Sequence, residues 1–376
     1  METKYNMLSD LGIEPIIQAG GPTTMYSGTR PRTEVLEAMR EMAESFVLMD
    51  ELLLSAGENI AEMLGVEAAT ITSGASGGLV LQAGAAITKG DSDIISKLPA
   101  TQGVPCELII QKSHRFSYDS LYLVPGSKLI EVGEKDGCTV EQIQDSINSQ
   151  TAGIIHLESP FKGAGCVNLN ELTSIAERNG LPVLVDAASM LPPRSNLTKF
   201  TNLGCDLVSF SGGKAIRGPQ STGFLVGKKD WIEYCRILNA PYPTVARAQK
   251  VSKEEIAGLL VALELFLKTD EKNEIEFYGL QMKFLVDQIV EIPGIDAKVV
   301  HNRDHYIPHA VVEFNSDWKG PTGRRLGELL LEGRPRIYVM HTYPGFDGIW
   351  VDPLNLQTGD LEIVSEELRK LLISFS

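Results

Sequence analysis

Apolar residues along the chain follow two alternating patterns. Short apolar runs, several of them rich in Val and Ile, are typical of buried β-strands and occur at 107–111, 128–132, 153–157, 182–186, 206–210 and 223–226. Between them, segments such as 140–147 and 170–178 have apolar residues three or four positions apart, as amphipathic helices do. Strands that alternate with helices favour an α/β fold with a mostly parallel sheet covered on both faces.

The patterns also predict how the chain is divided. Residues 31–64 have helical spacing, and the alternation stops near Asn239-Ala-Pro-Tyr-Pro-Thr244. Beyond this break the sequence predicts helices at 253–268, 272–291, 324–331 and 363–372, and strands at 310–314 and 335–340. We therefore expect an N-terminal segment (1–30), a large domain (31–240), and a helical connection followed by a small C-terminal α/β domain (241–376).

Composition narrows the class of protein. A chain of 376 residues that is 43% hydrophobic can bury a large core. Its 49 acidic and 34 basic residues give a net charge of −15, which opposes binding to nucleic acid or anionic membranes. The five cysteines are dispersed without CxxC spacing, so we expect reduced thiols rather than a disulfide framework or a metal site. With no apolar run of membrane-spanning length, a cytoplasmic protein is expected.

A lysine lies in a glycine-rich turn after one of the predicted strands, in the sequence Phe210-Ser-Gly-Gly-Lys214. Open α/β sheets bind ligands at the carboxyl ends of their strands. A lysine at that edge is partly desolvated, which lowers its pKa and frees the amine to attack a carbonyl group. Lys214 is therefore a candidate Schiff-base lysine, although a single loop lysine is more often only a solvated charge.

Two further segments favour a Schiff-base role for Lys214 over that of a solvated loop lysine. Leu181-Pro-Val-Leu-Val-Asp186 is an apolar strand that ends in a carboxylate at the same edge. In Ala69-Thr-Ile-Thr-Ser73-Gly-Ala-Ser76-Gly-Gly78, a strand meets a small-residue turn and a helix, whose free N–H groups suit a phosphate ester. Pyridoxal 5'-phosphate (PLP) needs such a set, with a lysine for its aldehyde, an aspartate for its ring nitrogen and an anion site. Each segment alone is weak evidence, but the phosphate turn, the acid and the lysine, in that chain order, are together much more specific.

At these positions the chain resembles the fold type I PLP enzymes. Among these enzymes it is most similar to the group that includes bacterial selenocysteine synthase and D-glucosaminate-6-phosphate ammonia-lyase. The matching segments are Thr72–Gly77, Val185–Ser189, Phe210–Lys214 with Gly218–Gln220, and Asp352–Leu356. The resemblance implies an aspartate aminotransferase-like architecture, with a large PLP-binding domain and a small C-terminal α/β domain. It also implies PLP as cofactor and an active site at the interface of a homodimer or higher homo-oligomer.

Other residues are expected to contact the cofactor. By the same resemblance, the imidazole of His114 lies flat on the pyridine ring, and Tyr118 takes that place if the loop turns differently. A histidine that only caps or packs is the alternative. The catalytic residues are then Lys214, Asp186 and His114, and the cofactor-binding residues are Ser73, Gly74, Ala75, Ser76, His114, Asp186, Ser189, Ser211 and Lys214. Some of the serines alternatively only shape their turns.

Substrate contacts are expected elsewhere in the chain. An arginine fork grips a carboxylate through two hydrogen bonds, and Arg336, or else Arg334, is the candidate. The hydroxyl-rich stretch 20–30 offers Thr23, Thr24 and Tyr26, or is a plain surface loop. Further basic residues are available to an acidic side chain or a sugar-acid phosphate, and nothing in the sequence selects among Lys162, Arg217, Arg303 and His305.

The assigned groups predict chemistry at the α-carbon of an amino acid or amino-sugar acid. Lys214, released from the cofactor by the substrate amine, is the expected acid/base, and the protonated ring accepts electrons. If the β-carbon carries a leaving group, elimination releases ammonia and a 2-oxo acid, which is the predicted lyase reaction. The alternatives are selenocysteine synthase-like transfer, which the acidic charge disfavours, and aminotransfer, racemisation or aldol cleavage. A non-catalytic PLP-fold binding or regulatory protein would be expected to lose the lysine or the aspartate.

Overall fold

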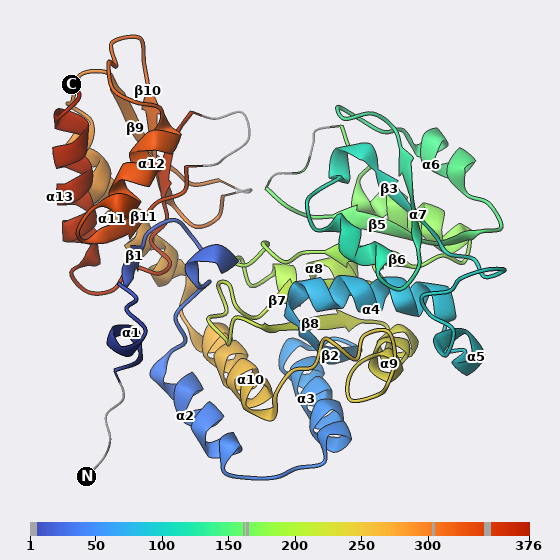
Figure 1. The fold of residues 1–376 in the computed structure, drawn as a ribbon. Coiled ribbons are helices and arrows are strands. Elements are labelled where there is room, and N and C mark those ends of the chain that lie inside the picture. Colours follow the sequence, from blue (N-terminus) through green and yellow to red (C-terminus); the bar gives the residue numbers. More distant parts are fainter. Residues whose placement is uncertain (1–5, 161, 163–164, 303–304, 342–346) are drawn as a thin grey trace. The chain divides into compact units, whose positions relative to one another are not determined.

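The computed structural model describes residues 6–160, 162, 165–302, 305–341 and 347–376. The chain forms two compact units (Figure 1). We call Pro31–Lys268 the large unit, and Met1–Arg30 with Thr269–Ser376 the small unit. Within the described residues, no helix is both long and apolar enough to cross a membrane.

The large unit is built on a seven-stranded sheet with the order β2-β8-β7-β6-β5-β3-β4. Neighbouring strands from β7 to β4 are parallel, whereas β8 is antiparallel to both β7 and β2. The strands are β2 (Ala68–Ser73), β3 (Glu107–Gln111), β4 (Lys128–Val132), β5 (Thr151–Leu157), β6 (Val183–Asp186), β7 (Leu207–Ser211) and β8 (Thr222–Gly227). The predicted mostly parallel sheet is confirmed.

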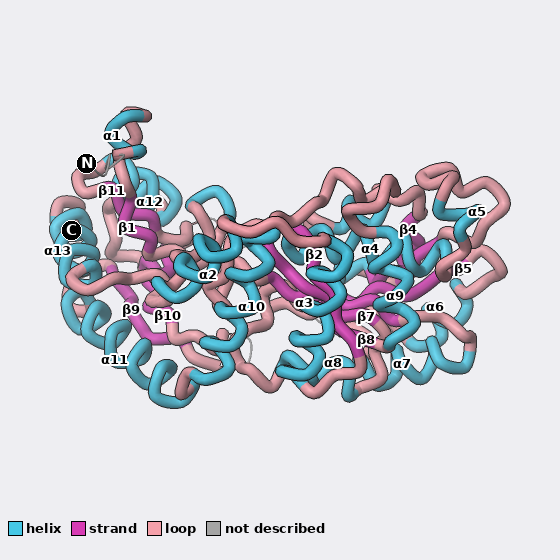
Figure 2. The backbone as a smooth tube through the Cα atoms, turned by 90° about the horizontal axis from the view of Figure 1, so that it is seen from below, coloured by secondary structure: helices cyan, strands magenta, loops and turns pink. Residues whose placement is uncertain are grey.

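Helices cover both faces of this sheet, and Figure 2 shows its strands between them. They are α2 (Thr33–Ala43), α3 (Met49–Leu64), α4 (Gly74–Thr88), α5 (Ser92–Ile95), α6 (Val140–Ser146), α7 (Leu169–Arg178), α8 (Asn196–Asn202), α9 (Lys229–Leu238) and α10 (Lys253–Lys268), with the short 3-10 turns η2 (Lys112–His114) and η3 (Asp119–Leu123). Successive strand residues point to opposite faces: Ile109 of β3 joins a core with α3, α7, α8 and α10, whereas Leu108 and Ile110 join a core with α4 and α9.

The prediction of helix throughout 31–64 is wrong at residues 44–48, where α2 ends before α3 begins. The two helices have different partners, because α2 packs against α10 and α3 packs against β2. Their buried faces differ accordingly: α2 buries Val35 alone, whereas α3 buries Leu53, Ala56, Gly57 and Ile60. The spacing of apolar residues in α2 and α3 did not show that their buried faces pack against different elements, so the break at residues 44–48 was missed.

Helix α4 is fixed to the sheet by a buried glutamine. Gln82 donates hydrogen bonds through Nε2 to the carbonyl oxygens of Val185 (3.0 Å) and Leu207 (3.1 Å), and its Oε1 accepts one from the hydroxyl of Tyr122 (3.2 Å). Gly78 lets the helix approach closely, since a Cβ atom there would lie 2.3 Å from Ser209 Oγ. The N-terminus of α4 is thereby held at a set place relative to β6 and β7.

The small unit contains an antiparallel sheet, β12-β10-β9, and the parallel pair β1-β11. Its elements are α1 (Met7–Asp10), β1 (Ile16–Gln18), η1 (Thr24–Tyr26), α11 (Glu271–Ile289), β9 (Ile295–Val300), β10 (His309–Phe314), α12 (Gly323–Glu332), β11 (Arg336–Tyr338), β12 (Gly348–Val351) and α13 (Asp360–Ile373). An N-terminal strand thus pairs with a strand near the C-terminus. Because α10 packs on α2 and α3, the units divide after Lys268 rather than near residue 240. The functional limits 1–30, 31–240 and 241–376 stay a prediction.

Replacing Gln82 by Leu preserves the size of the side chain but leaves two strand carbonyls and the Tyr122 hydroxyl without this partner. We expect the free energy of unfolding to fall by about 2–4 kcal/mol, because buried polar groups that lose a hydrogen bond cost roughly 1–3 kcal/mol each. Urea unfolding measures the change. The control is Gln144→Leu on the exposed side of α6, expected to shift stability by less than about 0.5 kcal/mol. Equal losses in both variants would contradict this account of Gln82.

Candidate active site

The sheet brings the predicted site residues of the large unit to one edge. Leu157, at the end of β5, is paired with Asp186, at the end of β6, and Asp186 is paired with Ser209 of β7. On the far side of β7, the first residue of β8, Thr222, pairs with Ser73, the last residue of β2. The segments that carry the acid, the lysine turn and the small-residue turn therefore leave the sheet at the same edge.

The lysine turn is closed by a backbone hydrogen bond and close packing. The N–H of Gly212 donates to the carbonyl oxygen of Thr222 at 2.9 Å. Gly213 has no room for a side chain, because a Cβ atom there would lie 2.5 Å from the Cα of Gln220. These glycines fold the chain back within a few residues of β7 and hold Lys214, which is half-buried, at the edge of the sheet.

Asp186 and Lys214 form an electrostatic pair. Asp186 is 5% exposed, and its Oδ1 accepts a hydrogen bond from the N–H of Ala188 at 2.9 Å. Burial raises the pKa of Asp186, while the bond from Ala188 and the charge of Lys214 oppose that rise. Burial lowers the pKa of Lys214, and Asp186 opposes the fall. Each group thus helps to keep the other ionised in a region that disfavours isolated charges.

The small-residue turn leaves the first turn of α4 open to a ligand. Ser73 occupies the N-cap position, and Gly74 begins the helix with a φ of +63°. In the described structure no side chain caps the helix at Ser73, and Ser76 is exposed. The Oε1 atom of Gln249 lies 3.4 Å from the place of a Cβ at Gly77, and it is buried without a hydrogen-bond partner among the described residues. Backbone N–H groups and an unsatisfied amide therefore meet at the helix N-terminus.

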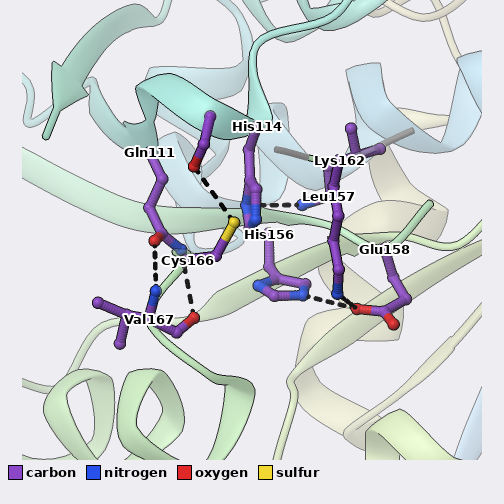
Figure 3. Close-up of polar contacts among 9 residues, drawn as sticks. Gln111, His114, His156, Leu157, Glu158, Lys162, Cys166 and Val167 are labelled. Carbon is purple, nitrogen blue, oxygen red and sulfur yellow. Dashed lines mark hydrogen bonds and ion pairs between the residues drawn. The ribbon is translucent and has the colours of Figure 1, made fainter. Parts of the chain in front are cut away.

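His114, the last residue of η2, is fully buried. Its ring lies beside Leu157, the last residue of β5 (Figure 3). Its Nδ1 accepts a hydrogen bond from the N–H of Leu157 at 3.3 Å, so the neutral imidazole carries its proton on Nε2. That Nε2 is buried and has no partner within the described part of the chain. Burial, with the charges of His156 and Lys162, lowers the pKa of His114 to about 3. Tyr118, the alternative ring, is 63% exposed.

A second group of polar residues beside His114 was not predicted as a unit. The ring of His156 lies edge-on to that of His114, with centroids 4.6 Å apart, and its Nε2 lies 3.0 Å from Glu158 Oε2. Lys162 Nζ donates to the same carboxylate oxygen at 2.7 Å (Figure 3). Burial raises the pKa of Glu158, but the bonds from His156 and Lys162 outweigh it and hold that pKa at about 2. Glu158 directly follows an apolar strand, and this signal, which identified Asp186, was available for it too.

The other predicted cofactor ligands differ in exposure. Ser211 ends β7 and is half-buried, whereas Ser189 is exposed in the turn after β6. Ala75 is buried, and its carbonyl oxygen accepts a hydrogen bond from Ser209 Oγ at 3.0 Å. Their contacts with a cofactor stay predictions.

The predicted substrate residues belong to the small unit. Thr24 and Tyr26 form η1, and the ring of Tyr26 stacks on Tyr338 with centroids 3.4 Å apart. Arg336 donates through Nε to the carbonyl oxygen of Leu331 at 3.1 Å, and Arg334, whose side chain is 82% exposed, pairs with Glu14 at 3.0 Å. Both arginines line a surface depression that also contains Glu14, Glu328 and Glu332. Their role toward a substrate stays a prediction, and Arg303 lies outside the described residues.

The mixed seven-stranded sheet, together with a second small sheet near the C-terminus, is the α/β architecture of fold type I PLP-dependent enzymes. Residues 55–294 match the family model described as SelA, L-seryl-tRNA selenium transferase. The chain belongs to this family of PLP-dependent enzymes, which confirms the resemblance inferred from the sequence motifs.

Two relatives are similar over nearly the whole chain. The D-glucosaminate-6-phosphate ammonia lyase of Salmonella typhimurium is 28% identical, and the match covers 97% of this chain and 98% of the relative. A 5'-C-glycyluridine monooxygenase-decarboxylase of a Streptomyces species is 29% identical, with 96% and 91% covered. A solved structure of a D-glucosaminate-6-phosphate ammonia-lyase has a TM-score of 0.84 at 27% identity and covers 99% of this chain and 100% of its own. The names of these relatives describe different reactions, so membership of the family does not fix the chemistry.

The low pKa of His114 predicts a pH dependence of stability. The folded protein keeps His114 neutral down to a pH of about 3, whereas the unfolded chain protonates it below about 6.5. The stability associated with neutral His114 is therefore present above pH 6.5 and lost as the pH falls toward 3. We expect the urea concentration at the unfolding midpoint to fall less steeply with decreasing pH in His114→Gln than in the unaltered protein. The control is His301→Gln at an exposed position. An unchanged pH slope in the His114 variant would contradict the burial of a neutral imidazole.

Proposed function

We propose that the protein is a PLP-dependent lyase that removes a β-substituent from an amino acid or amino-sugar acid and releases ammonia and a 2-oxo acid. The observation that carries the proposal is the meeting of Lys214, Asp186 and the open first turn of α4 at one edge of the sheet. The choice of elimination is supported by the similarity to an ammonia lyase along almost the full chain.

The residues at this edge fit PLP. Lys214 would hold the aldehyde, Asp186 the ring nitrogen, and the N–H groups after Ser73 the phosphate. The Nε2–H of His114 is buried and has no partner among the described residues, and such a donor is of the kind that a bound ligand completes. Gly74, Ala75, Ser76, Ser189 and Ser211 are the further proposed ligands.

The protein's own residues supply charge and proton transfer. When bound, PLP withdraws electrons from the α-carbon of a substrate. Lys214 Nζ is the proposed base that takes the proton from that carbon, and its burial favours the unprotonated amine that a base requires. Burial raises the pKa of Asp186, while Ala188 and Lys214 oppose that rise, and its carboxylate would accept the hydrogen bond of the ring nitrogen. His114, whose low pKa keeps it neutral, would lie on the ring without adding a positive charge.

The remaining assignments complete the proposal. Thr24, Tyr26 and Arg336, or else Arg334, are proposed to bind the substrate. A homodimer or larger homo-oligomer is supported by the large apolar side chains exposed around the break between α2 and α3, including Phe46 at 102% and Leu48 at 67%. A cytoplasmic location and the domain limits given above are part of the same proposal.

One alternative has an observation of its own. The second relative, at 29% identity over 96% of this chain, is named as a monooxygenase-decarboxylase, so oxygen uptake with loss of carbon dioxide is the second candidate reaction. Selenocysteine synthase-like transfer is disfavoured because a net charge of −15 opposes tRNA. Aminotransfer, racemisation and aldol cleavage would use the same residues and are separated by their products.

The cofactor assignment is tested by absorption and reduction. We expect the protein loaded with PLP to absorb at roughly 410–430 nm, and borohydride to abolish the band and attach the cofactor to Lys214. Peptide mass spectrometry locates the attachment. Lys214→Ala should lose the attachment completely, while Lys228→Gln, at the opposite edge of the sheet, should retain it. Attachment at another lysine, or none in the loaded protein, would overturn the assignment.

The reaction is tested by the products formed from L- and D-amino acids and amino-sugar acids. We expect ammonia and a 2-oxo acid in equal amounts. Asp186→Asn keeps the shape but removes the charge, and we expect kcat to fall by about a hundredfold or more, the effect of removing one well-placed electrostatic group. The PLP content of the variant serves as the control for cofactor loss. Oxygen uptake with carbon dioxide release would instead favour the second candidate, and an unchanged kcat would reject the role of Asp186.

A further inference from the structure

Lys162 is a second lysine near the proposed cofactor site, and the lyase chemistry above does not use it. Its side chain is 30% exposed, while that of its partner Glu158 is only 9% exposed. The charge of Lys162 acts on both His114 and His156. Lys162 therefore lies close to the imidazole that is proposed to cover the cofactor ring.

The position of the ammonium is fixed by its surroundings. Glu158 follows β5, and its backbone N–H donates to the carbonyl oxygen of Asp186 at 2.9 Å. Its carboxylate is oriented by His156 at 3.0 Å and binds Lys162 Nζ at 2.7 Å. A flexible lysine side chain is thus held at one place by a chain of contacts that begins at the strand carrying Asp186.

We propose that Lys162, held by Glu158, binds a second anionic group of the substrate, a phosphate or carboxylate remote from the reacting carbon. The inference rests on the proposed function and deepens it, because it restricts the substrates to amino acids or amino-sugar acids with an additional acidic group. An ammonium has three N–H groups, and the bond to Glu158 uses one of them. In the proposal, the other two make charge-assisted bonds to oxygens of the ligand.

A buried partner acid does not prevent such binding. The Lys–Glu ion pair of protein kinases likewise sets a lysine in place for the phosphates of its ligand. The remote phosphate or carboxylate of the substrate would contact the Lys162 ammonium directly. The negative charge of Glu158 is shared between Lys162 and its hydrogen bond with His156. In a chain with a net charge of −15, an acidic substrate requires a local cation of this kind.

The test compares ligands that differ by one anionic group and lack the reacting amine. Calorimetry on the PLP-loaded protein measures Kd for D-gluconate 6-phosphate against D-gluconate, and for glutarate against butyrate. We expect the protein to prefer the more acidic member of at least one pair. Lys162→Gln should reduce that preference by about tenfold to a hundredfold, the effect of losing one charge-assisted bond. Lys162→Arg should restore most of it. The pair that responds identifies phosphate or carboxylate as the ligand.

Two controls separate binding from stability. Lys228 also forms a 2.7 Å ion pair with a buried carboxylate, that of Asp206, but at the opposite edge of the sheet, so Lys228→Gln should leave the preference unchanged. The double variant Glu158→Gln with Lys162→Gln leaves no uncompensated buried charge, and it should lose the preference while remaining folded.

The inference is overturned if the unaltered protein shows no preference in either pair. It is also overturned if Lys162→Gln weakens both members of a pair equally, or changes the preference no more than Lys228→Gln does. Failure of the lyase proposal would be seen separately, as absence of ammonia or of the borohydride attachment at Lys214, because the ligands used here do not react.

Discussion

The side-chain amide of Gln82 is the constraint on which the rest of the proposed site depends. It joins α4 to the carbonyl oxygens of Val185, next to Asp186, and of Leu207, at the start of the strand that leads to Lys214. Helix α4, which begins at the small-residue turn, is therefore hydrogen-bonded directly to β6, which carries Asp186, and to β7, which leads to Lys214. A rigid cofactor needs its three anchors at fixed separations, and hydrogen bonds through a buried side chain fix them more firmly than apolar packing does.

Local sequence signals predicted much of this arrangement. The limits of β3, β4 and α10 agree with the apolar pattern, and Lys214 and Asp186 were predicted as site residues because each lies at or after the end of an apolar strand. The role of Gln82 had no local signal, since its partners are 103 and 125 residues away. The break at 44–48 was missed for a similar reason, because the different neighbours of α2 and α3 are set by tertiary packing. Sequence periodicity reports which face is buried, but not what it is buried against.

The charged groups at the edge of the sheet that carries the candidate site differ in balance from the chain as a whole. The molecule is acidic, with a net charge of −15, yet the edge of the sheet combines a neutral imidazole with two lysine–carboxylate pairs, one at Lys214 and one at Lys162. The first pair belongs to the part of the site that a common cofactor would require. The second lies on the segment after β5 and is not used by the proposed lyase chemistry.

The mutual dependence of Asp186 and Lys214 has a consequence for how the enzyme acquires its cofactor. Each of these buried groups is stabilised as an ion by the other when no ligand is bound. If Lys214 holds the aldehyde of PLP as proposed, the ring nitrogen would take its place as the partner of the carboxylate. The large unit therefore holds a compensated charge in both conditions, and it avoids the penalty of an isolated buried ion. Folding of the large unit would then not depend on PLP, because neither charge lacks a partner before the cofactor binds.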